Sequence, residues 1–103
     1  MTKRKPGLDP AKNDTTLRLY IAGDGPNSVA ARKNLDALLA RHPDRKVDLE
    51  LIDVLVDPER GLADGVLVTP LLVRGSPPPE RRVVGNLQDE NAVAAALGFG
   101  ECR

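Results

Sequence analysis

The sequence predicts a single α/β domain in which strands and helices follow one another in the order β-α-β-α-β-β-α. Its 103 residues suit one domain with one hydrophobic core. Two segments of alternating apolar and polar residues, separated by turn residues and a helical pattern, predict a β-α-β opening. Two further apolar segments and a closing run of helix formers predict the rest. Because Tyr20 and Phe99 are the only aromatic residues, we expect a core of Leu, Val, Ile and Ala.

The first strand is expected to run from Thr16 to Gly23, because apolar and more polar side chains alternate there. Its apolar members are Leu17, Leu19 and Ile21, and the alternating ones are Arg18 and Tyr20. Turn residues at 24–26 follow, and Asn27 or Ser28 is the expected cap of the next helix. One face of that helix collects Ala31, Leu35, Leu38, Leu39 and His42.

The second strand is expected from Val47, with alternate apolar residues facing inward and Asp48 and Glu50 turned toward solvent. Apolar residues continue beyond it. Asp57 as cap and Pro58 in the first turn then predict a helix, which two glycines keep short.

An apolar run at 66–73, broken by the step from Thr69 to Pro70, contains the expected third strand. The three prolines at 77–79 cannot join the interior of a sheet. Residues 81–84 predict a short fourth strand.

Asp89 and Glu90 lie in the expected first turn of the last helix, which extends to about Leu97 and stops at Gly98. Residues 16–99 are therefore expected to form the folded domain. Residues 1–15 are expected to be a disordered tail, because they are polar and carry prolines, and residues 100–103 form a short C-terminal tail.

Composition argues against several classes of partner. Fifteen basic and fifteen acidic side chains give no net charge, so no global field attracts nucleic acid or an anionic membrane. The lone cysteine, Cys102, cannot form an internal disulfide, and no apolar run suggests a signal peptide or a membrane span. We expect a cytoplasmic protein.

The order of elements is the thioredoxin-like plan. Redox proteins with this plan carry a Cys-Gly-Pro-Cys motif in the turn after the first strand. Asp24, Gly25, Pro26 and Asn27 occupy this turn here. Neither Asp24 nor Asn27 can supply the thiolate that disulfide exchange requires. We therefore expect no dithiol redox activity.

No other enzyme pattern is present in the sequence. His42 is the only histidine, which excludes a multi-histidine metal site, and its place on the apolar helix face favours a packing role. The phosphate-binding pattern G-x-x-x-x-G-K-[ST] does not occur. We expect no catalytic residue, no metal and no cofactor.

Four segments, in order and at the expected spacing, resemble the KaiB family of bacterial clock proteins. They are residues 17–23 with 26–28, residues 51–55 with 57–58, residues 69–72, and residues 77–79 with 81–87. The resemblance covers about residues 16–99. It implies a thioredoxin-like fold, and it implies that the bond between Thr69 and Pro70, before the third strand, is a cis peptide with a conformational role.

The resemblance also implies a function, that of a noncatalytic regulator that binds KaiC, a ring-forming ATPase. KaiB-family proteins can be metamorphic, with a ground state of dimers or tetramers in which the C-terminal half is rearranged. Four alanines within residues 92–97 favour the form with a terminal helix. Two alternatives stay open: a sensing or scaffold domain that binds a clock histidine kinase, and a divergent thioredoxin-like enzyme.

Partner binding is expected at the sheet edges, which the second and last strands form in a thioredoxin-like sheet. An exposed edge can accept a partner strand, and outward charges can set its register. The candidate partner-binding residues are Lys46, Asp48, Glu50, Arg81 and Arg82. Alternatively, the arginines only prevent edge-to-edge aggregation.

Overall fold

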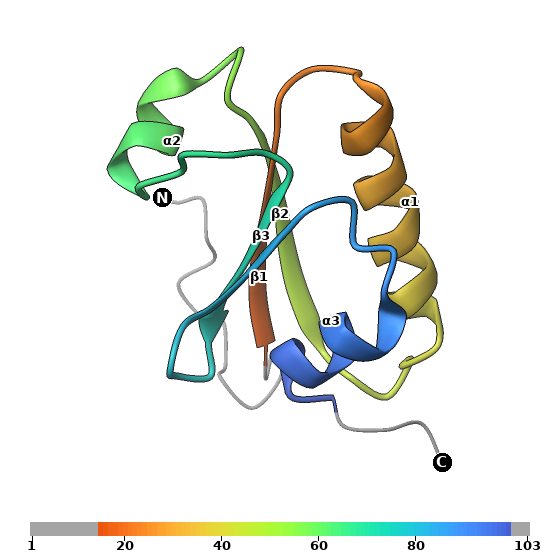
Figure 1. Cartoon of the computed structure of the whole chain (residues 1–103). Coiled ribbons are helices and arrows are strands. Elements are labelled where there is room, and N and C mark those ends of the chain that lie inside the picture. The colour runs from red at the N-terminus through yellow and green to blue at the C-terminus, as the bar shows by residue number, and fades with distance from the viewer. Residues whose placement is uncertain (1–14, 100–103) are drawn as a thin grey trace.

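The computed structural model describes residues 15–99, and they form the predicted order of elements (Figure 1). The strands are β1 (Thr15–Ile21), β2 (Val47–Asp53), β3 (Leu71–Ser76) and β4 (Arg81–Val84). The helices are α1 (Pro26–Ala40), α2 (Pro58–Ala63) and α3 (Glu90–Leu97). Of the tails expected at 1–15 and 100–103, residues 1–14 and 100–103, with Cys102, lie outside the described residues. Thr15 is not part of a tail but belongs to β1, where its N–H donates to the carbonyl of Lys46 at 3.2 Å.

The four strands form one sheet in the order β2-β1-β3-β4. β1 and β2 are parallel, and α1 connects them, while β1 with β3 and β3 with β4 are antiparallel. In this register Leu19 lies between Leu51 of β2 and Leu72 of β3. The expectation that β2 and β4 form the edges is confirmed.

Helices α1 and α3 cover one face of the sheet, and α2 lies on the other (Figure 1). The larger core lies under α1 and α3. Its buried residues are Leu17, Leu19, Ala31, Leu35, Leu38, Leu72, Leu87, Val93, Ala94, Leu97 and Phe99. The α2 side has a smaller core of Tyr20, Ile52, Leu71 and Val73, with Val54 and Val66 packed against it.

One local prediction is wrong. The cap of α1 is Gly25 rather than Asn27 or Ser28, because Pro26 takes the first helical position, where its missing N–H and fixed φ are best tolerated. The Ser28 hydroxyl instead accepts a hydrogen bond from the N–H of Ala22 at 3.3 Å.

Only the last part of the apolar run at 66–73 becomes strand. β3 begins only at Leu71, because residues 66–70 carry the chain from α2 back to the sheet and Pro70 has no N–H for the ladder. β3 instead continues through Arg74 to Ser76. Apolar character alone therefore does not identify the strand here, and Leu67 is 93% exposed.

The ends of α3 follow the sequence closely. Asp89 is its N-cap and accepts a hydrogen bond from the N–H of Ala92 at 3.1 Å. Gly98 closes the helix in the left-handed region, with φ of 78°. Phe99 then turns inward, and its ring contacts His42, which follows α1 and is buried. Within residues 15–99, no helix has the length and apolar character needed to cross a membrane.

Candidate partner-binding site

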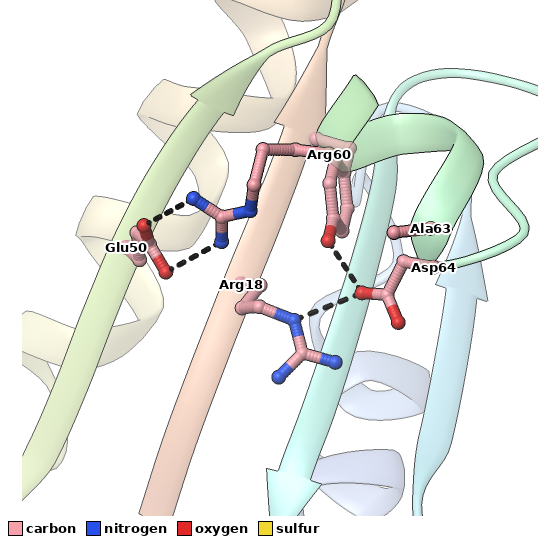
Figure 2. Close-up of a pocket in the computed structure, with 6 residues that line it drawn as sticks. Arg18, Glu50, Arg60, Ala63 and Asp64 are labelled. Carbon is pink, nitrogen blue, oxygen red and sulfur yellow. Dashed lines mark hydrogen bonds and ion pairs between the residues drawn. The ribbon is translucent and has the colours of Figure 1, made fainter. Parts of the chain in front are cut away.

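The face of the sheet that carries α2 holds a group of charged and hydroxyl side chains. Because side chains alternate along a strand, Arg18 and Tyr20 of β1 point away from α1 and toward α2. Asp64, at the C-terminal end of α2, accepts hydrogen bonds from the Arg18 Nε at 3.0 Å and from the Tyr20 hydroxyl. Figure 2 shows Arg18 reaching from β1 to Asp64 across the pocket.

Three ion pairs extend this group toward both sheet edges. On β2, Glu50 accepts two hydrogen bonds from Arg60 of α2, at 2.9 and 3.0 Å (Figure 2). On β4, Arg82 donates to the Asp64 carbonyl at 2.6 Å and also pairs with the carboxylates of Asp64 and Glu80. We refer to six of these residues as the charged cluster: Arg18, Tyr20, Glu50, Arg60, Asp64 and Arg82.

Protonation states in the cluster are set mainly by burial and by Asp64. Burial alone would raise the pKa of Asp64, but hydrogen bonds from Tyr20 and Arg18, with the charges of Arg18 and Arg82, hold that pKa below its ordinary value. Burial, together with the Asp64 carboxylate, raises the pKa of the Tyr20 hydroxyl. At neutral pH the carboxylate is therefore ionised and the hydroxyl keeps its proton.

These polar contacts hold α2 on the sheet. Gly61 is the only buried residue in α2, and Leu62 is 79% exposed, so hydrophobic packing contributes little there. Gly61 is needed for close approach, since a Cβ at this position would lie 3.0 Å from a methyl carbon of Val54. The helix is thus fastened by Asp64 and Arg60 rather than by an apolar stripe.

Beside the charged cluster lies an exposed set of apolar side chains, which we call the apolar patch: Leu55, Val56, Leu62, Leu67 and Val68. Leu62, Leu67 and Val68 line a hollow of about 340 Å³ with Val54, Pro58 and Gly61. Exposed apolar side chains gathered around one hollow, as Leu62, Leu67 and Val68 are, are a feature of interaction sites. Apolar and charged groups side by side are suited to binding a protein surface.

The turn where redox members of this fold place their thiols is a different kind of surface here. Asp24 lies exposed in the turn before α1, and Asn27 is in the first turn of that helix. A carboxylate and an amide cannot exchange disulfides. The chemistry of this turn therefore does not match that of a dithiol oxidoreductase.

The structure brings only some of the sequence-predicted site residues together. Glu50 and Arg82 join the α2 face through the charged cluster, and Asp48 shares that face because it pairs with Thr16. Lys46 precedes β2 and is exposed. Arg81 projects to the opposite face, toward α3, because it lies directly across from Arg74. The proposed binding role of these five residues stays a prediction.

The bond between Thr69 and Pro70 is cis, and it leads directly into β3. Two further cis bonds precede Pro77 and Pro79 in the β3–β4 connection. The conformational role proposed for Thr69 and Pro70 is likewise a prediction.

Sequence reasoning missed Arg18, Tyr20, Arg60 and Asp64 as site residues. The sequence pattern around Arg18 and Tyr20 could have indicated a site, because two bulky polar side chains lie on the same face of a central strand. Arg60 and Asp64 could have done so as well, since they lie four residues apart and so share one side of a short helix. What the sequence lacks is the pairing of these two segments.

The chain is similar to known proteins in sequence. A family model described as the KaiB domain matches residues 18–99. The circadian clock oscillator protein KaiB of Cyanothece sp. is 39% identical over 90 residues, which cover 87% of this chain and 86% of that protein. KaiB1 of Synechocystis sp. has the same identity and coverage. KaiB of Gloeothece citriformis is 41% identical over 81 residues, 79% of this chain and 76% of that protein.

Solved structures with the same fold include thioredoxins. Mitochondrial thioredoxin 3 from Saccharomyces cerevisiae superposes with a TM-score of 0.69 at 18% identity, covering 85% of this chain and 80% of that one. The N-terminal domain of Synechococcus elongatus SasA gives a TM-score of 0.67 at 21% identity, covering 100% of this chain and 98% of that one. At these identities the likeness concerns the fold.

Proposed function

The chain belongs to the KaiB family, and on that premise we propose that it is a noncatalytic clock regulator that acts by binding another protein. The observation that carries this proposal is the family match over residues 18–99, on a thioredoxin-like frame that lacks thiols at positions 24 and 27. Its relatives are named circadian clock oscillator proteins. A divergent thioredoxin-like enzyme would need another reactive group in that turn, and none of its residues supplies one.

The proposed partner is a KaiC-type ATPase ring, as the family resemblance implies. The sensor domain of a clock histidine kinase shares the fold. The structural likeness to the SasA domain concerns the fold and does not indicate which partner this chain binds. Self-association into dimers or tetramers would compete with ring binding if both use the same surface.

The α2 side supplies the surface that fits this role best. Its apolar patch offers side chains that are each more than half exposed, and the charged cluster borders it on the sheet. Desolvated apolar groups supply most of the binding energy at protein interfaces, while bordering charges set orientation. The edge strand β2, with Lys46, Asp48 and Glu50, extends this surface. Arg82 extends it toward β4.

Replacing Leu67 by Gln tests this surface, because Leu67 is 93% exposed and contributes nothing to either core. Full burial of a leucine is worth about 1.5–3 kcal/mol, so ring binding should weaken by roughly 10- to 100-fold in calorimetry with the purified ring. Val29→Thr, on α1 and 45% exposed, is the control and should bind as the wild type does. Failure of the wild-type protein to bind any KaiC-type ring would refute the proposal.

We also propose that the domain can rearrange, with the thioredoxin-like form predominant in the absence of a partner. The four alanines of α3 favour a helix, and two packings of one sequence coexist only within a few kcal/mol. Backbone NMR of the isolated protein should show helical chemical shifts for residues 90–97. Strand shifts there, or a rearranged tetramer alone, would contradict this.

A further inference from the structure

The arginines of residues 15–99 fall into two groups. One group pairs with carboxylates: Arg18, Arg32, Arg41, Arg60 and Arg82. The other group is Arg45, Arg74 and Arg81, none of which forms an ion pair with an acidic side chain of residues 15–99. These three come from different segments of the chain. Arg45 and Arg74 contact residues at the C-terminal end of α3, and Arg81 lies across from Arg74.

Arg74 is the most unusual of the three because it is only 6% exposed. Its Nη2 donates to the carbonyl of Pro79 at 2.7 Å, while its Nε is buried with no hydrogen-bond partner in the described part of the chain. Its Nη1 lies against the end of α3, 3.0 Å from where a Cβ on Gly98 would be. A buried charge that keeps one neutral partner is costly unless a counter-ion joins it.

Arg81 lies directly opposite Arg74 in the β3–β4 pair, so the two side chains share a face of the sheet. Arg81 is exposed, and its side chain makes no hydrogen bond or ion pair with residues 15–99. Like charges in this position repel each other. The next residue along β4 provides a contrast, because Arg82 faces the α2 side and is neutralised by Glu80 and Asp64.

Arg45 approaches the same end of α3 from the turn between α1 and β2. Its Nη2 donates to the carbonyl of Phe99 at 3.1 Å, and its guanidinium lies 5.0 Å from the centre of the Phe99 ring. Figure 1 shows this turn, the β3–β4 hairpin and the end of α3 at one end of the sheet. A helix C-terminus carries only about half a negative elementary charge, which cannot balance three guanidinium groups.

We propose that Arg74 and Arg81 form a binding site for a carboxylate on an acidic segment of the partner protein, with Arg45 adding to the local positive potential. That the partner is a protein follows from the function proposed above. A carboxylate bound at the exposed guanidinium of Arg81 relieves the repulsion and places a counter-ion beside the buried charge of Arg74. The planar fork of arginine donates two parallel hydrogen bonds to such a group. This site lies on the α3 side of β4, apart from the apolar patch.

The test is a titration of the full chain with a hexaglutamate peptide, monitored by backbone amide NMR at low salt. Hexaglutamine is the uncharged control. Saturable shifts are expected at the amides of Arg74, Arg81 and Gly98 with hexaglutamate alone. In Arg81→Gln, binding should weaken about tenfold or more, since a charge-assisted hydrogen bond contributes about 1.5–3 kcal/mol. Arg32→Gln removes one positive charge from the surface of α1 and should bind within about twofold of wild type.

Equal binding by Arg81→Gln and Arg32→Gln, or equal shifts with hexaglutamine, would overturn the proposal. Inorganic phosphate is a third titrant. If it shifts the same amides while hexaglutamate does not, the site takes phosphate and the assignment to a carboxylate is wrong.

Binding to the ring distinguishes this proposal from the proposed function. If the ring binds wild type and Arg81→Gln equally, the carboxylate site is refuted and the proposed function stands. If hexaglutamate binds at Arg81 but the protein binds no ring, the carboxylate site stands and the proposed function is refuted.

Discussion

The two faces of the sheet are stabilised in different ways. Under α1 and α3 the buried side chains are almost all aliphatic, and Leu19, Leu35 and Leu72 have no exposed surface. Under α2, a smaller apolar core is bordered by the charged cluster, and α2 itself buries only Gly61. One face therefore derives its stability from hydrophobic burial, and the other largely from hydrogen bonds and ion pairs.

This difference separates the part of the domain that maintains the fold from the part that is available for binding. A well-packed aliphatic core loses stability with every missing methylene. A helix fastened by polar contacts leaves its apolar side chain Leu62 exposed, and the connection that follows the helix exposes Leu67. Substitutions on the two faces should therefore lower the free energy of unfolding by different amounts. The ranking of these losses tests whether the two faces are stabilised differently.

The largest effect is expected in the core under α1. Leu35→Ala removes a side chain with no exposed surface, between the sheet and its longest helix. The free energy of unfolding should fall by about 2–5 kcal/mol, from lost burial and the cavity left behind. Urea denaturation followed by circular dichroism measures it. A loss smaller than that for Asp64→Asn would reverse the proposed ranking of the two faces.

The next effect is expected at Asp64. Asp64→Asn leaves the shape of the side chain but removes the charge that pairs with Arg18 and Arg82. A hydrogen bond to a charged group contributes about 1.5–3 kcal/mol, so a loss of about 1–3 kcal/mol is expected, since the carboxylate is partly exposed. Asp36→Asn, whose partner Arg32 is on the surface of α1, is the control and should cost much less.

The stability difference between the wild-type protein and Asp64→Asn should depend on pH. Because the pKa of Asp64 is lowered in the folded state, its contribution is present above the pKa of an unfolded aspartate, about 3.9. It is lost as the pH falls from there toward the lower folded-state pKa. The stability difference between wild type and Asp64→Asn should therefore be constant near neutral pH and shrink below about pH 4. A difference that persists unchanged to pH 2.5 would show that the charge is not responsible.

The smallest effect is expected at the edge of the charged cluster. Glu50→Gln breaks the exposed pair with Arg60, and such pairs contribute about 0.2–1 kcal/mol. The loss should diminish further in 1 M salt, where the Debye length is about 3 Å. Thermal unfolding at low and high salt checks this. A loss as large as that for Asp64→Asn would show that Arg60 is the principal attachment of α2.

The sequence predicts the element order well because strand alternation and helical spacing are local properties. Leu17, Leu19 and Ile21 mark β1 without reference to any other segment, and Asp89 with Gly98 marks both ends of α3. The family resemblance adds the sheet order and the cis bond at Pro70. The apolar run that starts at Val66 does not by itself mark where β3 begins, because an apolar run can be either a buried strand or an exposed connection.

The charged cluster could not be predicted in the same way. Arg18 pairs with Asp64, 46 positions later, and only the placement of α2 over the sheet brings the two together. The separation of Arg81 from Arg82 depends likewise on the β3–β4 register, since adjacent strand residues face opposite sides. Residue type indicates that these side chains are polar, whereas the tertiary register determines which carboxylate, if any, each one meets.

The shallow burial of α2 also determines how the backbone exchanges its amide hydrogens. Amides of β1, a central strand with a partner on each side, become accessible only when the whole domain unfolds. Those of α2 become accessible through a smaller opening, in which Asp64 and Arg60 separate from the sheet while the aliphatic core stays intact. We therefore expect the segment from Leu55 to Val68 to open as a cooperative unit of its own, with a lower opening free energy than β1. It is also where a protease would first find cleavable backbone in the native protein.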